Sequence, residues 1–147
     1  MTDLQGRFAE GVHVFPVRIY YEDTDAGGVV YYANYLRFAE RARTEMLRAL
    51  GVEGARLADT DGVAFAVRHC AADFVRPARL DDLLEVRTRL LGVGGASLRA
   101  EQTVFRGAEP LVRLELKLAC TGRSGRTARM PKDLRSSLEG ICNKKVN

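Results

Sequence analysis

Hydrophobic residues recur with two different periods along this chain, and the period changes near residue 62. Over residues 34–50 apolar side chains return every three or four positions, as they do on one face of an α-helix. The stripe consists of Tyr35, Ala39, Ala42, Met46 and Leu50. Gly51 follows it, as is typical where a helix ends, and Asn34 is suited to cap its start. The pattern therefore predicts one long amphipathic helix.

Strands are expected on both sides of this helix. Residues 14–21 form a run of β-favouring side chains, with Pro16 near its start, where proline is tolerated. After a short helical turn and loop at residues 54–62, apolar and polar positions alternate. The alternation is clearest over residues 112–118, where Arg113, Glu115 and Lys117 occupy the polar face. The expected strands of this half are residues 63–75, 83–91, 96–106 and 111–121.

The connections and the end of the chain complete the expected architecture. Residues 92–95 and 107–110 are short, glycine-containing turns that favour antiparallel hairpins. We expect an edge strand at residues 126–129, a short helix at 131–138 and a frayed tail at 141–147. One long helix has one sheet on which to bury its stripe, which predicts a single α+β domain over residues 1–147 with a core at about 14–138. The free edges of this sheet favour a dimer.

Composition narrows the class of protein. The 147 residues include 29% charged and 46% hydrophobic side chains, which is ordinary for a globular domain with a core of its own. No stretch of about twenty apolar residues and no basic, apolar leader occurs, so we expect a cytoplasmic protein. Cys70, Cys120 and Cys142 lack metal-binding spacing and are expected to be reduced thiols, and no metal site is predicted.

The formal net charge of +4 favours anionic partners. Coenzyme A and nucleic acid both fit that charge. Because the basic residues are dispersed and no nucleic-acid-binding motif is present, nucleic acid is not expected. Contact with a membrane surface stays open.

The most informative segment joins the first strand to the long helix through an acidic turn. Asp23 and Asp25 precede Gly27 and Gly28, which permit a tight turn and a close approach of backbone to ligand. Aspartates in turns commonly bond their own backbone, which is the simplest interpretation of both. A carboxylate next to the free N–H groups of a helix start also suits acyl transfer, because one group attacks or deprotonates and the others stabilise an oxyanion.

The chain resembles the hotdog-fold acyl-CoA thioesterases of the 4-hydroxybenzoyl-CoA thioesterase group, and within it the Tol–Pal-associated subgroup. Residues 17–51 carry most of the similarity, residues 63–86 agree, and the whole spans about residues 17–138. The resemblance implies a sheet wrapped around a central helix and hydrolysis of an acyl-CoA thioester to a free acid and CoA. It also implies a homodimer or homotetramer with active sites at subunit interfaces, and no cofactor. Acyl carrier protein is a second candidate partner.

The same resemblance assigns roles to single residues. Asp25 matches the catalytic carboxylate, either as a nucleophile or as a general base, and Tyr32 matches the residue whose backbone N–H polarises the thioester carbonyl. The Tol–Pal-associated subgroup usually has histidine at the position of Tyr32, so a side-chain role there is in doubt while the backbone role is kept. Gly27, Gly28 and Val29 are expected to line the substrate site, and Asp23 to brace the turn.

Two further expectations concern the substrate. Arg126 and Arg129 are candidates for binding the CoA phosphates, because phosphates pair well with arginine. The alternative function is a non-catalytic acyl-CoA or acyl-carrier-protein binding module. The thioesterase hypothesis requires the Asp25 carboxylate to lie opposite the start of the helix, with space for a thioester between them.

Overall fold

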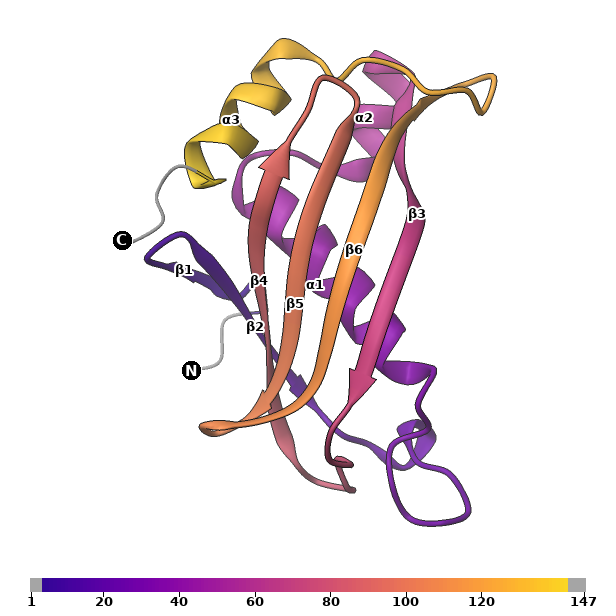
Figure 1. Ribbon diagram of the computed structural model, residues 1–147, viewed down its shortest axis with the longest axis vertical. Helices are drawn as coiled ribbons and strands as arrows, with labels where there is room; N and C mark the ends of the chain where they lie inside the picture. The colour runs from indigo at the N-terminus through magenta and orange to yellow at the C-terminus, as the bar shows by residue number, and fades with distance from the viewer. Residues whose placement is uncertain (1–3, 143–147) are drawn as a thin grey trace.

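A six-stranded antiparallel sheet curls around one long helix in the computed structural model, which describes residues 4–142 (Figure 1). The strand order is β1-β2-β4-β5-β6-β3. The strands are β1 (Arg7–Ala9), β2 (Val12–Arg18), β3 (Val63–Phe74), β4 (Leu83–Val93), β5 (Ser97–Arg106) and β6 (Glu109–Gly122). The helices are α1 (Asn34–Ala49), α2 (Gly54–Asp61) and α3 (Lys132–Cys142), and a short 3₁₀ turn, η1, covers Tyr21–Asp23. The predicted α+β hotdog class is confirmed.

Most predicted elements form within a few residues of their expected ends, and the differences lie at the termini. The β1 strand was not predicted. The expected edge strand at residues 126–129 is wrong, because this segment makes a single bridge between Thr121 and Thr127. The tail was expected to fray from residue 141, yet Ile141 is buried and α3 continues to Cys142. Residues 143–147 lie outside the described part of the chain.

The long helix packs its predicted stripe against the concave face of the sheet. Tyr35, Ala39, Ala42 and Met46 are each no more than 3% exposed, and Phe38 joins them. From the sheet, alternate residues of β6 meet this stripe, including Leu114 and Leu116, while the polar residues between them face outward. At about 25 cal/mol per Å² of buried apolar surface, this layer is the main source of stability.

A second apolar cluster closes the end of the sheet at which α1 terminates. There α3 lies across the end of β4 (Figure 1), and Leu134, Leu138 and Ile141 from α3 pack with Met46 and Leu90. The chain then turns at Gly51, whose φ of 83° is the left-handed conformation typical of a residue after a helix. Within the described residues, no helix has both the length and the apolar character needed to cross a membrane.

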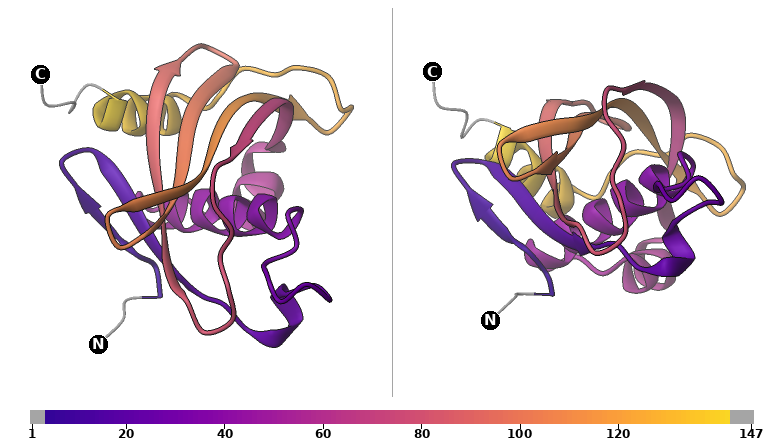
Figure 2. Two further views of the ribbon diagram at one scale, coloured as in Figure 1. Left: turned by 60° about the horizontal axis from the view of Figure 1, so that its bottom comes forward. Right: turned by 90° about the horizontal axis from the view of Figure 1, so that it is seen from below.

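One long edge of the sheet is uncovered by residues 4–142. Among these residues β3 pairs with β6 alone, and its residues from Ala66 to Phe74 are all exposed. Cys70 and Phe74 stand opposite the buried residues Leu116 and Val112 of β6, so they face the concave side. The two views of Figure 2 show the sheet curling over α1, with β3 at its border. This edge therefore offers both backbone hydrogen-bonding groups and an apolar surface.

Candidate active site

The acidic turn lies beyond the start of α1, at the opposite end of the helix from α3 (Figure 1). Asp23 braces it: its carboxylate Oδ2 accepts the N–H of Tyr20 at 2.9 Å, and its carbonyl oxygen accepts the N–H of Tyr31 at 3.0 Å. The predicted structural role of Asp23 is confirmed by these contacts.

Asp25 begins a tight turn that its own backbone closes. Its carbonyl accepts the N–H of Gly28 at 3.0 Å, and its N–H donates to the carbonyl of Val29 at 2.9 Å. The side-chain Oδ1 accepts the N–H of Gly27 at 2.9 Å. Oδ2 accepts no hydrogen bond from residues 4–142, and the side chain is exposed. One carboxylate oxygen is therefore held, and the other is available for chemistry.

The two glycines of this turn are required for different structural reasons. Gly28 has a φ of 79°, which strains any residue with a side chain. A Cβ on Gly27 would lie 3.2 Å from Oδ1 of Asp25, which is a tight contact. Glycine at this position therefore avoids crowding the carboxylate. Val29 is half-buried and bridges to Arg79, which attaches the turn to the loop after β3.

The start of α1 presents two backbone donors that are not used within the described chain. The N–H groups of Asn34, Tyr35 and Leu36 donate to carbonyls three residues earlier. In contrast, the N–H groups of Tyr32 and Ala33 donate to no group of residues 4–142. Such donors carry the positive end of the helix dipole and stabilise negative charge on oxygen. The Tyr32 N–H is therefore chemically suited to the role that the sequence predicted for it.

A cavity of about 210 Å³ borders Tyr32. Its walls are mainly aromatic and aliphatic: Val30, Tyr32, Tyr35, Phe74, Val75, Arg76 and Pro77. The ring of Phe74 contacts those of Tyr32 and Tyr35, with centroid separations of 5.9 and 6.0 Å. The rings of Tyr32 and Phe74 stay 61% and 49% exposed, so the cavity has an apolar but open wall.

The single chain does not bring all predicted groups into this cavity. Asp25 does not line it, and its carboxylate lies on the solvent side of the turn with Oδ1 directed at Gly27. The sequence predicted an acid facing the helix start across a space large enough for a thioester. The structure has the space beside the helix start, but the acid does not face it. Tyr32 lines the cavity, whereas Asp25 does not.

Arg126 and Arg129 lie still farther away. Both are exposed in the loop that follows β6, at the end of the sheet near α2 and α3 (Figure 1). β6 has 14 residues, and at about 3.3 Å per residue it separates this loop from the Asp25 end by roughly 40 Å. Within one chain these arginines cannot contact a ligand bound at Tyr32.

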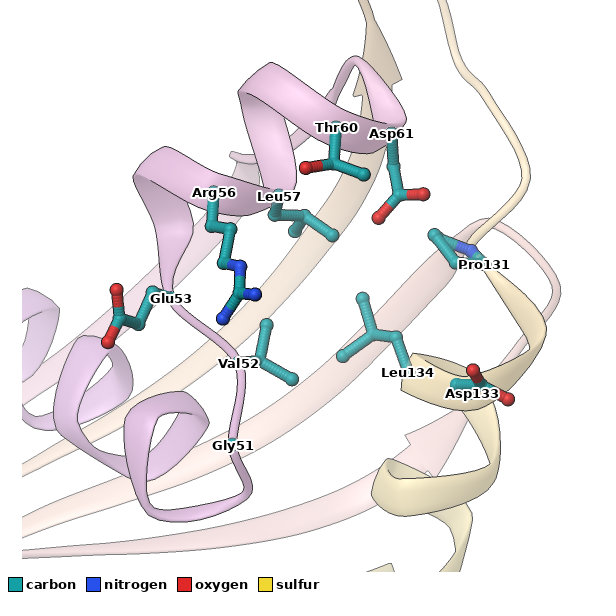
Figure 3. A pocket seen from close by; sticks show the side chains of 10 residues that line it. All are labelled: Gly51, Val52, Glu53, Arg56, Leu57, Thr60, Asp61, Pro131, Asp133 and Leu134. Carbon is teal, nitrogen blue, oxygen red and sulfur yellow. The ribbon is translucent and has the colours of Figure 1, made fainter.

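A second cavity, of about 240 Å³, lies near these arginines between α2 and α3 (Figure 3). Figure 3 shows Val52, Leu57 and Leu134 facing its centre, while the carboxylates of Asp61 and Asp133 lie on either side of Pro131. Among the described residues, its lining contains no histidine, cysteine or serine.

Burial shifts the pKa of two side chains on α1. Burial raises the pKa of the Tyr35 phenol above its usual value of 10, although the N–H of Ala78, which donates to its oxygen at 3.0 Å, opposes the shift. Burial also lowers the pKa of Arg43, whose guanidinium donates to the buried Gln102. Tyr35 is therefore neutral at ordinary pH and serves as a hydrogen-bond acceptor.

Sequence reasoning missed three residues of this region. Tyr35 was assigned only to the helix stripe, and Phe74 only to a strand, yet both form walls of the cavity. Asn34 was expected to cap α1, but the cap position belongs to Ala33, and the Asn34 amide reaches back to Asp23. The contacts of these residues join segments that are far apart in the sequence and meet only in the fold. No periodic pattern could therefore predict them.

Comparisons with known proteins agree with this geometry. The thioesterase-like superfamily matches residues 20–138. The acyl-CoA thioesterase YbgC of Haemophilus influenzae is 50% identical over 106 residues, which cover 72% of this chain and 78% of that protein. The acyl-CoA thioester hydrolase YbgC of Escherichia coli is 50% identical over 105 residues, covering 67% and 78%.

Solved structures show the same architecture. A probable thioesterase from Bartonella henselae superposes with a TM-score of 0.79 at 40% identity, covering 82% of this chain and 99% of the other. A family match over most of the chain, two relatives at 50% identity and a shared fold lead to one conclusion: this chain belongs to the thioesterase-like superfamily and has its hotdog fold.

Proposed function

We propose that this protein is an acyl-CoA thioesterase that hydrolyses the thioester to a free carboxylic acid and CoA. The superfamily membership supports the reaction class. The observation that carries the proposal is the N–H of Tyr32 at the start of α1, which no group of residues 4–142 accepts and which lies beside an apolar cavity. An acyl group of apolar character fits that wall, and its carbonyl oxygen would meet the helix start.

Asp25 is the proposed catalytic carboxylate. As a nucleophile it attacks the thioester carbon and forms a mixed anhydride, which water then hydrolyses; as a general base it takes a proton from the attacking water. In both routes the thiolate of CoA leaves and is protonated. The free Oδ2 of Asp25 supports either role, because Oδ1 stays bound to the N–H of Gly27.

The N–H of Tyr32 is the proposed oxyanion donor. As the carbonyl carbon becomes tetrahedral, its oxygen gains negative charge, and a fixed donor there lowers the barrier more than it stabilises the substrate. The phenol of Tyr32 is not needed for this step. Its ring, with Phe74 and Tyr35, forms a wall of the proposed acyl site, while Gly27, Gly28 and Val29 shape the turn.

A second copy of the chain is the proposed partner of the free β3 edge. The edge carries unpaired backbone groups along Val63–Phe74 and an exposed apolar concave side that includes Val67 and Phe74. Pairing of two β3 strands around a two-fold axis satisfies both features at once. Such a homodimer has a continuous sheet, and pairing of dimers would give the homotetramer.

This dimer would also explain how the arginines after β6, which lie far from Tyr32 in the same chain, could reach a bound CoA. In an antiparallel β3 pair, the start of the partner's strand lies beside Phe74, and the partner's loop after β6 lies near the same point. Arg126 and Arg129 of the partner subunit would then approach the cavity at Tyr32, where CoA phosphates need cationic groups. The proposed site is therefore composite, with the acid and the oxyanion donor from one subunit and the phosphate contacts from the other.

The decisive experiment measures CoA release from short-chain, long-chain and aromatic acyl-CoAs. Chromatography should be used to quantify CoA, because the exposed Cys70 would react with a thiol reagent. We expect turnover of at least one substrate, and a loss of at least roughly a hundredfold in kcat for Asp25→Asn. Glu10→Gln, an exposed substitution in the turn between β1 and β2, at the opposite edge of the sheet from β3, is the matched control and should keep full activity.

Each alternative has its own result. Tight binding of acyl-CoA or of acylated carrier protein without CoA release would identify a binding module. Equal activity of Asp25→Asn and wild type would show that another group performs the chemistry.

A further inference from the structure

The side chain of Asn34 connects the two halves of the proposed site. Asn34 is the first residue of α1 and is 7% exposed. Its Nδ2 donates to the carbonyl oxygen of Asp23 at 2.9 Å, and its Oδ1 accepts a hydrogen bond from Arg37 at 3.2 Å. One amide therefore joins the turn that carries Asp25 to the helix that presents the N–H of Tyr32.

The carbonyl of Asp23 is a point of convergence. It accepts hydrogen bonds from both Nδ2 of Asn34 and the backbone N–H of Tyr31, and Asp25 follows only two residues later. Within residues 4–142, no other side chain of α1 forms a hydrogen bond to η1 or to the acidic turn. The turn itself is exposed at Asp25, Gly27 and Gly28, so few other contacts fix its orientation relative to α1.

We propose that Asn34 is a positioning residue that sets the separation between the Asp25 carboxylate and the N–H of Tyr32. The inference rests on the proposed thioesterase function. A displacement of about 1 Å between reacting groups can reduce a rate by about a hundredfold, whereas contacts that bind CoA elsewhere are unaffected. Loss of the Asn34 contact should therefore lower kcat and leave KM nearly unchanged.

The residue type matches the requirement. An amide donates to Asp23 and accepts from Arg37 at the same time. An ionised aspartate has nearly the same shape and keeps the acceptor for Arg37, but it has no proton to donate and repels the carbonyl oxygen. Asn34→Asp thus removes one function of the side chain with little change in volume.

The test compares two variants that each break one of the two contacts. Asn34→Asp loses the bond to Asp23, and Arg37→Gln loses the bond to Asn34 Oδ1 while leaving the bond to Asp23. We expect kcat of Asn34→Asp to fall by roughly ten- to a hundredfold with KM within about threefold of wild type. For Arg37→Gln we expect kcat within about twofold of wild type, because its contact is partly exposed.

Folding and catalysis are measured separately. Thermal unfolding of each variant is followed by circular dichroism, and kinetics are recorded well below the lower midpoint. If Asn34→Asp does not fold, Asn34→His, whose ring N–H replaces the donor, is compared with Asn34→Ser, whose hydroxyl is too short to reach. The histidine variant should then keep the higher kcat.

Several results would overturn the inference. An unchanged kcat in Asn34→Asp, with or without a lower unfolding temperature, would mean that Asn34 is structural only. A rise in KM at constant kcat would mean that it contributes to binding. Asp25→Asn serves as the reference: if it is inactive while Asn34→Asp is fully active, the positioning role alone fails, and if Asp25→Asn is itself active, the proposed function fails as well.

Discussion

The two ends of α1 are held in different ways. At its C-terminal end Met46 lies in an apolar cluster that α3 completes with Leu134, Leu138 and Ile141. At its N-terminal end Tyr35 and Phe38 are also buried in the core, but single hydrogen bonds link the helix to its neighbouring loops, from Asn34 to Asp23 and from Ala78 to Tyr35. The rings of Tyr32 and Phe74 stay partly exposed there.

This difference separates stability from chemistry. Apolar burial is non-directional and gains free energy from every surface removed from water, so this cluster contributes mainly to stability. Hydrogen bonds contribute less free energy but specify distance and angle. These directional contacts lie at the end of α1 that carries the acidic turn with Asp25 and the N–H of Tyr32, which no group of residues 4–142 accepts.

The largest effect on stability is expected at the closed end. Leu138→Ala removes a fully buried side chain from the cluster, and the free energy of unfolding should fall by about 2–5 kcal/mol. Chemical denaturation measures that loss. At a temperature where the variant is folded, kcat should equal that of wild type, and a selective loss of kcat would contradict the separation of the two ends.

At the open end, Tyr32→Pro tests the backbone donor directly. Proline has no N–H and is tolerated near a helix start, so the fold should persist while kcat falls by roughly a hundredfold or more. Tyr32→Ala also loses the ring but keeps the N–H, so steady-state kinetics should find a much smaller loss of kcat than in Tyr32→Pro. Tyr32→Phe loses only the phenol and should stay within a few-fold of wild type. Equal losses in Tyr32→Ala and Tyr32→Pro would assign the role to the side chain.

A smaller effect is expected for Tyr35→Phe. It leaves the buried N–H of Ala78 without its acceptor and should cost about 1–3 kcal/mol at pH 7. Because burial raises the folded-state pKa of Tyr35 above 10, its contribution to stability is complete below pH 10 and is lost as the pH rises through the folded-state pKa.

The difference in unfolding free energy between wild type and Tyr35→Phe should therefore shrink above pH 10. Urea denaturation at pH 7 and at several values above 10 measures it. A difference that stays constant across this range would show that Tyr35 ionises equally in the folded and unfolded states.

Much of the fold followed from periodicity. The stripe from Tyr35 to Met46 and the alternation around Arg113 and Glu115 each specify which side chains are buried, because one period belongs to helices and the other to strands. The short β1 strand has too few residues to show a period. The helix end at Ile141 depended on the β4 surface that α3 covers, which no local pattern describes.

The candidate site was predictable only in part. The acidic residues and the glycines located the turn before the helix, and the resemblance to the thioesterases assigned Asp25 and Tyr32 their roles. The bond from the Gly27 N–H to the Asp25 carboxylate is the local bond expected of an aspartate in a turn. The wall contributed by Phe74 and the amide bridge from Asn34 to Asp23 were not predictable, because each joins segments that meet only through folding.

The sequence by itself determined that this chain has one long helix, an antiparallel sheet and an acidic turn before the helix, because local geometry and hydrophobic period are properties of neighbouring residues. The tertiary structure decided that the arginines after β6 lie about one strand length from that turn, and that β3 is left as a free edge. Strand order and curvature arise from packing across the whole sheet. They leave β3 as the edge at which a second subunit could pair and bring its arginines to the turn.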